Sequence, residues 1–142
     1  MTEERRQMDL ALKQIVVPRL REMGFKGSMP HFRRVRGDLL DLLSVQFDRY
    51  GGSFCVEVAS APAAGLQYTP DWFVPAEKLN VGYTRERLRL GAPEGLTDHW
   101  FEFGPRSFEP AQSLPSRSRF EAVAEQVAAL VDTEAEPWWR SR

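Results

Sequence analysis

The sequence predicts an α+β fold: an antiparallel sheet of about five strands with N- and C-terminal helices packed on one face. Apolar residues recur at helical spacing near both ends of the chain. Between these ends, short stretches alternate apolar and polar residues and are separated by glycine-containing turns, a pattern typical of strands. The 142 residues, 42% hydrophobic and 27% charged, are expected to form a single domain, residues 1–142.

The first helix is expected to follow Thr2, whose side chain can cap it, and to stop at Gly24. Pro18 lies inside this segment and removes a backbone donor, so we expect a kink there, or two helices that meet. One apolar stripe is expected to pack against the rest of the protein: Met8, Leu12, Ile15, Val16, Leu20 and Met23.

Residues 31–59 are predicted to form a three-stranded antiparallel meander. The middle strand, residues 39–48, carries Leu40 and Leu42 on one face and Leu43 and Val45 on the other, so both of its faces should be covered. Gly51-Gly52 is suited to a tight hairpin before the third strand.

The next part of the chain is predicted to leave the sheet and then return to it. Residues 61–82 contain several prolines but also aromatic residues, which indicates a packed excursion over one sheet face, with a short helix at residues 75–79. Residues 84–90 and 99–103 then read as a second strand pair, joined by a turn-rich loop.

A C-terminal helix is predicted from an apolar stripe between residues 120 and 131. Ser118 and Glu121 match a capping box at its start, and Pro137 is expected to mark its end. Trp138 and Trp139 follow that proline, and we expect them to fold back onto the protein.

Composition excludes several classes of function. Cys55 is the only cysteine, so it can form neither an internal disulfide nor a cysteine-based zinc site, and it is expected to be a small buried hydrophobic residue. The N-terminal segment lacks the apolar core of a signal peptide, and no apolar run approaches the length that spans a bilayer, so a cytoplasmic protein without a membrane partner is expected.

Charge is unevenly distributed along the chain. Residues 1–36 carry nine Lys/Arg and four Asp/Glu, a net +5, and the remainder carries −6, which gives the overall net charge of −1. This near-neutral balance disfavours nucleic-acid binding, and no nucleic-acid recognition motif accompanies the arginines.

Two arginine clusters are candidate binding surfaces. Arg33 and Arg34 lie in the first strand with His31 nearby, but neighbouring strand residues point to opposite faces, and pairing with aspartates across the hairpin is the alternative. Arg85, Arg87 and Arg89 have the spacing of a single strand face, which suits an anionic partner. The alternative for this second cluster is a solvated face that pairs with an acid such as Glu102.

No residue set indicates a reaction. A histidine metal site would need both His31 and His99 together with a carboxylate such as Glu57 or Glu102, and these residues have no motif spacing. Asp98 precedes His99 directly, so on a strand the two would point apart. We expect no metal, no cofactor and no catalytic residue.

The chain also resembles a known family. The resemblance is carried by ALKQIVVPRLREMGFKGSMPHFRRVRGDLLDLLSVQFDRYGGSFCVEV, followed by RLRLG, DHWFEF and EPWW. These segments are similar to the small bacterial proteins grouped as domain of unknown function 4304. The resemblance implies a stand-alone single-domain protein and supplies no activity, cofactor or functional residue.

These observations favour a non-catalytic module that binds a protein or peptide, with an immunity or antitoxin-like role as one form of it. Its expected contact residues are Arg33, Arg34, Arg85, Arg87 and Arg89, together with Trp72. The alternative is a small-molecule-binding protein or hydrolase with a pocket between the sheet and residues 61–82, where His31 and His99 would contribute.

Overall fold

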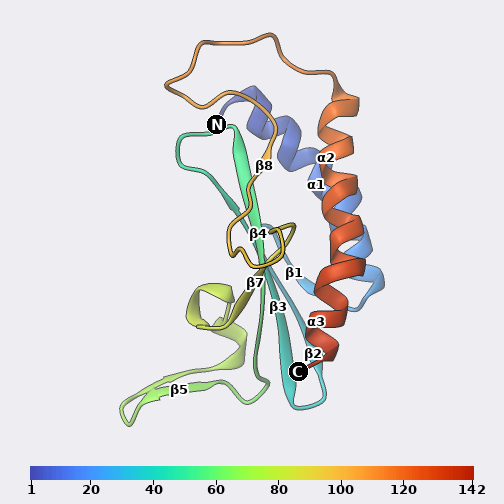
Figure 1. Cartoon of the computed structure of the whole chain (residues 1–142). Helices are drawn as coiled ribbons and strands as arrows, with labels where there is room; N and C mark the ends of the chain where they lie inside the picture. The colour runs from blue at the N-terminus through green and yellow to red at the C-terminus, as the bar shows by residue number, and fades with distance from the viewer.

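The computed structural model describes residues 1–142 and shows a six-stranded antiparallel sheet with its long helices on one face (Figure 1). The predicted α+β fold is confirmed. The helices are α1 (Glu3–Glu22), α2 (Arg117–Leu130) and α3 (Glu136–Arg140). The sheet strands are β1 (Lys26–Ser28), β2 (His31–Arg36), β3 (Leu39–Phe47), β4 (Ser53–Pro62), β7 (Arg87–Arg89) and β8 (Phe101–Glu102). Their order is β1-β2-β3-β4-β7, and β8 also pairs with β4.

Helix α1 begins and ends where the sequence predicts. The Thr2 hydroxyl accepts a hydrogen bond from the Arg5 backbone N–H at 3.2 Å. Gly24 has a φ of 97°, and Phe25 N–H donates to the Leu20 carbonyl at 2.9 Å, which closes the helix end. The helix is continuous across Pro18, so the alternative of two helices is wrong. Pro18 lies on the exposed side of α1, where water can reach the carbonyl left without a donor.

The predicted meander is confirmed as β2, β3 and β4, and β1 adds to it at the outer edge. Strand β3 packs on both faces. Leu43 and Val45 join the large core beneath α1 and α2, and Leu40 and Leu42 join a smaller core on the opposite face. We call the sheet face opposite α1 and α2 the outer face.

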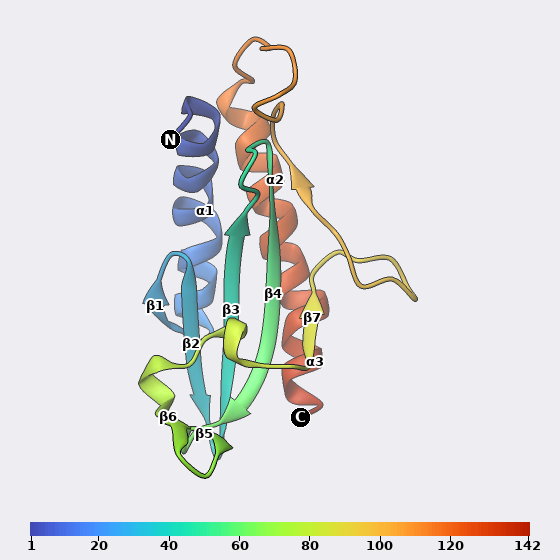
Figure 2. The same ribbon diagram turned by 90° about the vertical axis from the view of Figure 1, so that its left-hand side faces the viewer.

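The outer face is partly covered by the excursion after β4 (Figure 2). It contains a hairpin of β5 (Leu66–Thr69) and β6 (Trp72–Val74), which the sequence did not predict, and two short 3-10 turns, η1 (Ala76–Lys78) and η2 (Val81–Tyr83). The turn η1 corresponds to the predicted short helix. Val74, Leu79 and Val81 are buried against the outer face.

Strands β7 and β8 were predicted to pair with one another, and this is wrong. Both pair with β4, β7 with Glu57–Ala59 and β8 with Ser53–Phe54, so they follow one another along the same edge. The predicted strand from residue 84 also begins only at Arg87. The cause is Thr84, whose backbone N–H and hydroxyl both donate to the Val81 carbonyl and so belong to η2.

The C-terminal helix differs from the prediction at both ends. It starts at Arg117 with Ser116 at the N-cap, so the predicted capping box at Ser118 and Glu121 is wrong; Glu121 instead accepts a hydrogen bond from Arg117 at 2.9 Å. Helical structure also continues past Pro137, through a π-helical turn at Val131–Ala135 into α3.

Trp139 confirms that the C-terminal segment folds back. It is fully buried, packs on Phe25 at 4.8 Å between ring centroids, and donates from Nε1 to the Ala59 carbonyl at 3.1 Å. Trp138 is partly buried against the same core. No helix combines the length and apolar character that crossing a membrane requires.

Candidate functional site

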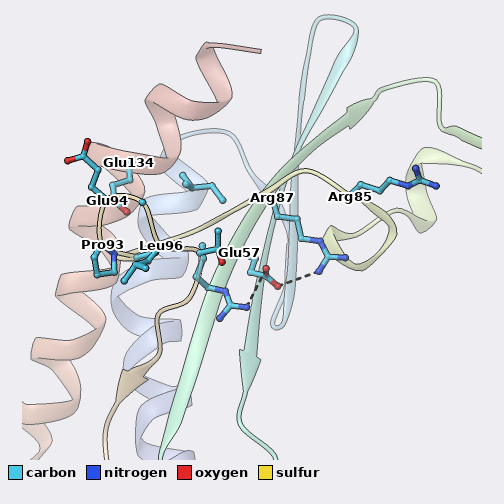
Figure 3. A pocket seen from close by; sticks show the side chains of 12 residues that line it. Glu57, Arg85, Arg87, Pro93, Glu94, Leu96 and Glu134 are labelled. Carbon is cyan, nitrogen blue, oxygen red and sulfur yellow. Dashed lines mark ion pairs between the residues drawn. The ribbon is translucent and has the colours of Figure 1, made fainter.

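A cleft with a volume of about 580 Å³ lies beside β7 (Figure 3). Arg85, Arg87 and Arg89 line it together with Glu57 of β4. The opposite wall is the loop that follows β7, residues 92–97. The second arginine cluster is therefore brought together in one cleft.

Arg87 and Arg89 share a single carboxylate. Arg87 Nη1 lies 3.6 Å from Glu57 Oε1, and Arg89 Nη2 lies 3.6 Å from Glu57 Oε2 (dashed lines in Figure 3). This distance is longer than a hydrogen bond, so two cations compete for one loosely held anion. Arg87 is also held by the Thr84 carbonyl, which accepts from its Nε at 3.1 Å and its Nη2 at 2.9 Å.

Arg85 is the free cation of the cluster. It precedes β7, is exposed, makes no hydrogen bond or ion pair, and points away from Glu57 (Figure 3). Its guanidinium can therefore bind an anion without first breaking a contact within the protein.

Arg89 is the most constrained of the three. Its Nη1 donates to Asp98 at 2.8 Å, and its guanidinium lies 5.4 Å from the Trp100 ring centroid. Its Nε is buried and donates to no protein atom. A buried donor without a partner costs free energy, so a ligand oxygen or a water at this position would be stabilised.

The loop that closes the cleft is pinned at its start. The backbone N–H of Gly91 donates to the Glu134 carboxylate of the π-helical turn at 2.8 Å. Gly91 has a φ of 82°, and a Cβ there would lie 2.6 Å from the His99 ring, so this turn requires glycine. Leu96, at the far side of the loop, is 63% exposed.

The first arginine cluster is not a free surface. Arg33 and Arg34 point to opposite faces, as the strand geometry predicts. Arg33 donates to the carbonyls of Ala76, Glu77 and Leu79 and so holds η1 against the sheet.

Arg34 lies on the helix side and is only 7% exposed. It donates to Asp41 at 2.9 Å and forms a two-bond contact with Glu136 at 2.9 and 3.0 Å. Arg36 also donates to Asp41, at 3.0 Å. The predicted cross-hairpin pairing with an aspartate is confirmed. The guanidinium groups of Arg34 and Arg36 are paired within the protein and are not available to bind a partner.

The two histidines do not converge. His31 is on β2, where its Nδ1 lies 2.8 Å from the Ser44 hydroxyl, and burial lowers its pKa. His99 packs edge-on against Phe101 at 4.7 Å, and β3 and β4 separate β2 from β8 in the sheet. No group of three or more His, Cys, Asp and Glu residues is placed to hold a metal ion.

The pocket predicted between the sheet and residues 61–82 is replaced by apolar packing. Leu40, Leu42, Val74, Leu79 and Val81 are buried in that interface. Trp72 belongs to the β5–β6 hairpin, is half-exposed and stacks on a tyrosine, but it does not line the cleft beside β7.

Cys55 has no role in the cleft. It is buried on β4, and desolvation raises its pKa to about 11, so it stays a thiol at neutral pH.

Sequence reasoning missed the loop as a wall of the site. Residues 91–95 were interpreted only as a turn, although a loop between two strands is a common position for binding residues. Glu134, which anchors this loop from 43 residues away, has no local signal in the sequence.

Comparison with known proteins gives the family and nothing finer. No curated protein and no solved structure is significantly similar to the chain. The family model described as "Domain of unknown function (DUF4304)" matches residues 16–141, and the chain therefore belongs to this family.

Proposed function

We propose that the protein is a non-catalytic binding module that recognises an acidic segment of a protein partner in the cleft beside β7. The observation that carries the proposal is a cleft lined by Arg85, Arg87 and Arg89, in which Arg87 and Arg89 lie 3.6 Å from the Glu57 carboxylate and Arg85 has no acidic partner. The Arg85 guanidinium is unpaired and Arg87 has only a loose contact with Glu57, so both can bind carboxylates of a partner.

The cleft also contains the features that a protein partner needs besides charge. Leu96 offers an exposed apolar side chain at the rim, and Leu88 contributes an apolar surface from β7. Arginines beside exposed apolar residues are typical of protein-binding surfaces. An immunity or antitoxin-like role, in which the acidic segment belongs to a toxin, is one form of this proposal and is supported by analogy alone.

The test is binding of a fluorescein-labelled hexapeptide of alternating Val and Glu, measured by fluorescence anisotropy. The variant is Arg85→Glu combined with Arg87→Gln; it avoids placing new carboxylates at the positions that contact Glu57. We expect this variant to bind about tenfold more weakly, because it loses two exposed charge contacts of about 0.2–1 kcal/mol each and adds a repulsive carboxylate at residue 85.

Lys26→Glu is the matched control. Lys26 is exposed on β1, at the opposite edge of the sheet, and takes part in no ion pair. If the control weakens binding as much as the cleft variant, or if neither changes it, the cleft is not the binding site. Affinity for the peptide should also fall as salt is added, since the contacts are exposed.

A small anionic molecule is the second candidate for the same cleft. Its volume of about 580 Å³ falls within the range of small-molecule pockets, about 300–1,000 Å³. Thermal shift measurements with citrate and with inorganic phosphate test this candidate. A rise in melting temperature that Arg85→Glu removes would support it, and no rise at millimolar concentration would exclude these anions.

A further inference from the structure

We infer that β7 is a docking edge at which an extended acidic segment adds to the sheet as a further strand. This inference rests on the proposed function and specifies how the segment binds. It follows from the backbone of β7, from the position of the cleft and from the way the strand separates its side chains.

The backbone of β7 leaves hydrogen-bonding groups free on the side away from β4. Leu90 N–H donates to the Val56 carbonyl at 2.9 Å, so residue 90 faces β4. Successive residues of an antiparallel strand alternate in direction, so Leu88 also faces β4, and Arg87 and Arg89 face outward. Outside the β4–β7 ladder neither Arg87 N–H nor Arg89 N–H donates a hydrogen bond, and the Arg89 carbonyl accepts from Ala92 N–H at 3.3 Å.

The cleft lies along this open edge. Its lining combines Arg87 and Arg89, whose side chains lie on the outer face, with Leu88 and Glu134 from the helix side. Because side chains from both faces of β7 line the cleft, the cleft must extend around the edge of this strand. The free backbone groups therefore border the cleft, and the loop of residues 92–97 forms its other wall.

Charge within the cleft favours an extended occupant. The lining contains three arginines and three glutamates, so a compact anion would meet little net charge. Glu94 and Glu134 lie together, however, on the side away from Arg85 and Arg87 (Figure 3). A segment that lies along the edge can keep its acidic groups beside the arginines alone.

An added strand would sort its side chains by alternation. Side chains on the outer face would lie beside Arg87 and Arg89, and those on the helix side would lie beside Leu88. The expected ligand is thus a segment that alternates acidic and apolar residues. Its backbone supplies affinity and its alternation supplies specificity, as in other cases of strand addition.

A short edge strand with two arginines is also a known protection against aggregation. Protection requires only that the edge repels other strands, whereas docking requires a cleft that holds one. The experiment separates the two.

The experiment uses the full chain and the labelled Val–Glu hexapeptide with two N-methylated forms. One form carries N-methyl groups on the amides of odd positions, and the other carries them on the amides of even positions. An added strand hydrogen-bonds β7 with only one of these sets. We expect one form to bind at least about tenfold more weakly than the parent and the other to bind within about twofold of it. A scrambled peptide, with three glutamates followed by three valines, should also bind about tenfold more weakly.

Amide hydrogen exchange of the protein gives an independent readout. The Arg87 and Arg89 amides should exchange rapidly in the free protein and slowly with saturating parent peptide, while Leu88 and Leu90 remain protected throughout. Equal binding of both N-methylated forms, with no added protection of Arg87 and Arg89, overturns strand addition. If that peptide binding still depends on Arg85, the proposed function survives; if no peptide binds, both proposals fail and the arginines serve edge protection only.

Discussion

Asp41→Asn is the substitution with the clearest expected effect on stability. Asp41 is completely buried on the helix side of β3. Its Oδ2 accepts from Arg34 Nε at 2.9 Å and Arg36 Nε at 3.0 Å, and its Oδ1 accepts from Arg36 Nη2 at 3.2 Å. Asparagine keeps the shape of the side chain but removes its charge, and its amide group would place N–H donors against N–H donors of the arginines.

The magnitude follows from burial. Removing one partner of a buried ion pair costs about 3–5 kcal/mol, because the remaining charge stays desolvated. Arg34 is 7% exposed and would keep Glu136 as its only carboxylate partner, and Arg36 would lose its only carboxylate. A loss of about 3 kcal/mol lowers the melting temperature of a protein of this size by roughly 10 °C.

The assay is urea denaturation followed by far-UV circular dichroism, with Asp38→Asn as the control. Asp38 is exposed in the neighbouring turn and forms no ion pair, so its substitution should change the free energy of unfolding by less than about 0.5 kcal/mol. A loss of less than about 1 kcal/mol in Asp41→Asn would refute the reasoning, since it would mean that the two arginines find water or other partners at no cost.

Three further predictions concern the C-terminal segment and the thiol. Trp139→Ala should lose about 3–5 kcal/mol of unfolding free energy in urea titrations, and Trp139→Phe about 1–3 kcal/mol, because phenylalanine refills much of the core but leaves the Ala59 carbonyl without its donor; a loss below about 0.5 kcal/mol in Trp139→Phe would contradict the role of the indole N–H. The hydrogen bond from Arg34 lowers the pKa of Glu136 below 4.5, so its stabilising contribution is present above pH 4.5 and is lost as the pH falls through the lowered value. The difference in unfolding free energy between wild type and Glu136→Gln should therefore be large at pH 7 and shrink below pH 4.5, and a constant difference would argue against the ion pair. Burial raises the pKa of Cys55 to about 11, so its reaction with a thiol reagent at pH 8 should be slow in the folded protein and fast in urea; rapid labelling without denaturant would show that β4 opens.

Local patterns predicted the elements that depend on neighbouring residues. The meander was predictable because alternation and Gly51-Gly52 act over a few residues. The opposite directions of Arg33 and Arg34 follow from strand geometry alone. The alternative that some arginines of this cluster pair with aspartates across the hairpin also followed from the sequence, and the contacts of Arg34 and Arg36 with Asp41 confirm it.

The remaining features depend on contacts between distant segments. Glu136 reaches Arg34 across 102 positions of the chain, and Glu134 reaches Gly91 across 43. Strand β8 pairs with β4 and not with β7, because the free edge of β4 is long enough for β7 and β8 to pair with it one after the other. None of these contacts follows from a periodic pattern or a motif, so the sequence could not place the cleft, although it did place Arg87 and Arg89 on one strand face; Arg85 lies before the strand.

The π-helical turn at Val131–Ala135 explains why the helix continues past Pro137. Through Glu134 it also contacts the loop that lines the cleft. Buried residues recur at intervals of four: Val127, Val131, Ala135 and Trp139. In a regular α-helix of 3.6 residues per turn, three such steps would rotate the stripe by about 120°. The π-helical turn, in which Glu136 N–H donates to Val131 five residues earlier, takes up extra residues and keeps the stripe on the sheet.

The same turn suits proline, because Pro137 follows a segment whose hydrogen bonds are already displaced. It also places Glu134 beside the Gly91 amide, which fixes the loop that forms one wall of the cleft. Inserting a π turn is frequently associated with functional sites. Its two consequences, the burial of Trp139 and the anchoring of the loop, can be separated. Glu134→Ala removes the acceptor of the Gly91 N–H and should free the loop while Trp139 stays buried, so peptide affinity should fall with little change in the melting temperature. Glu134→Gln keeps an acceptor oxygen and is the control that should retain the affinity.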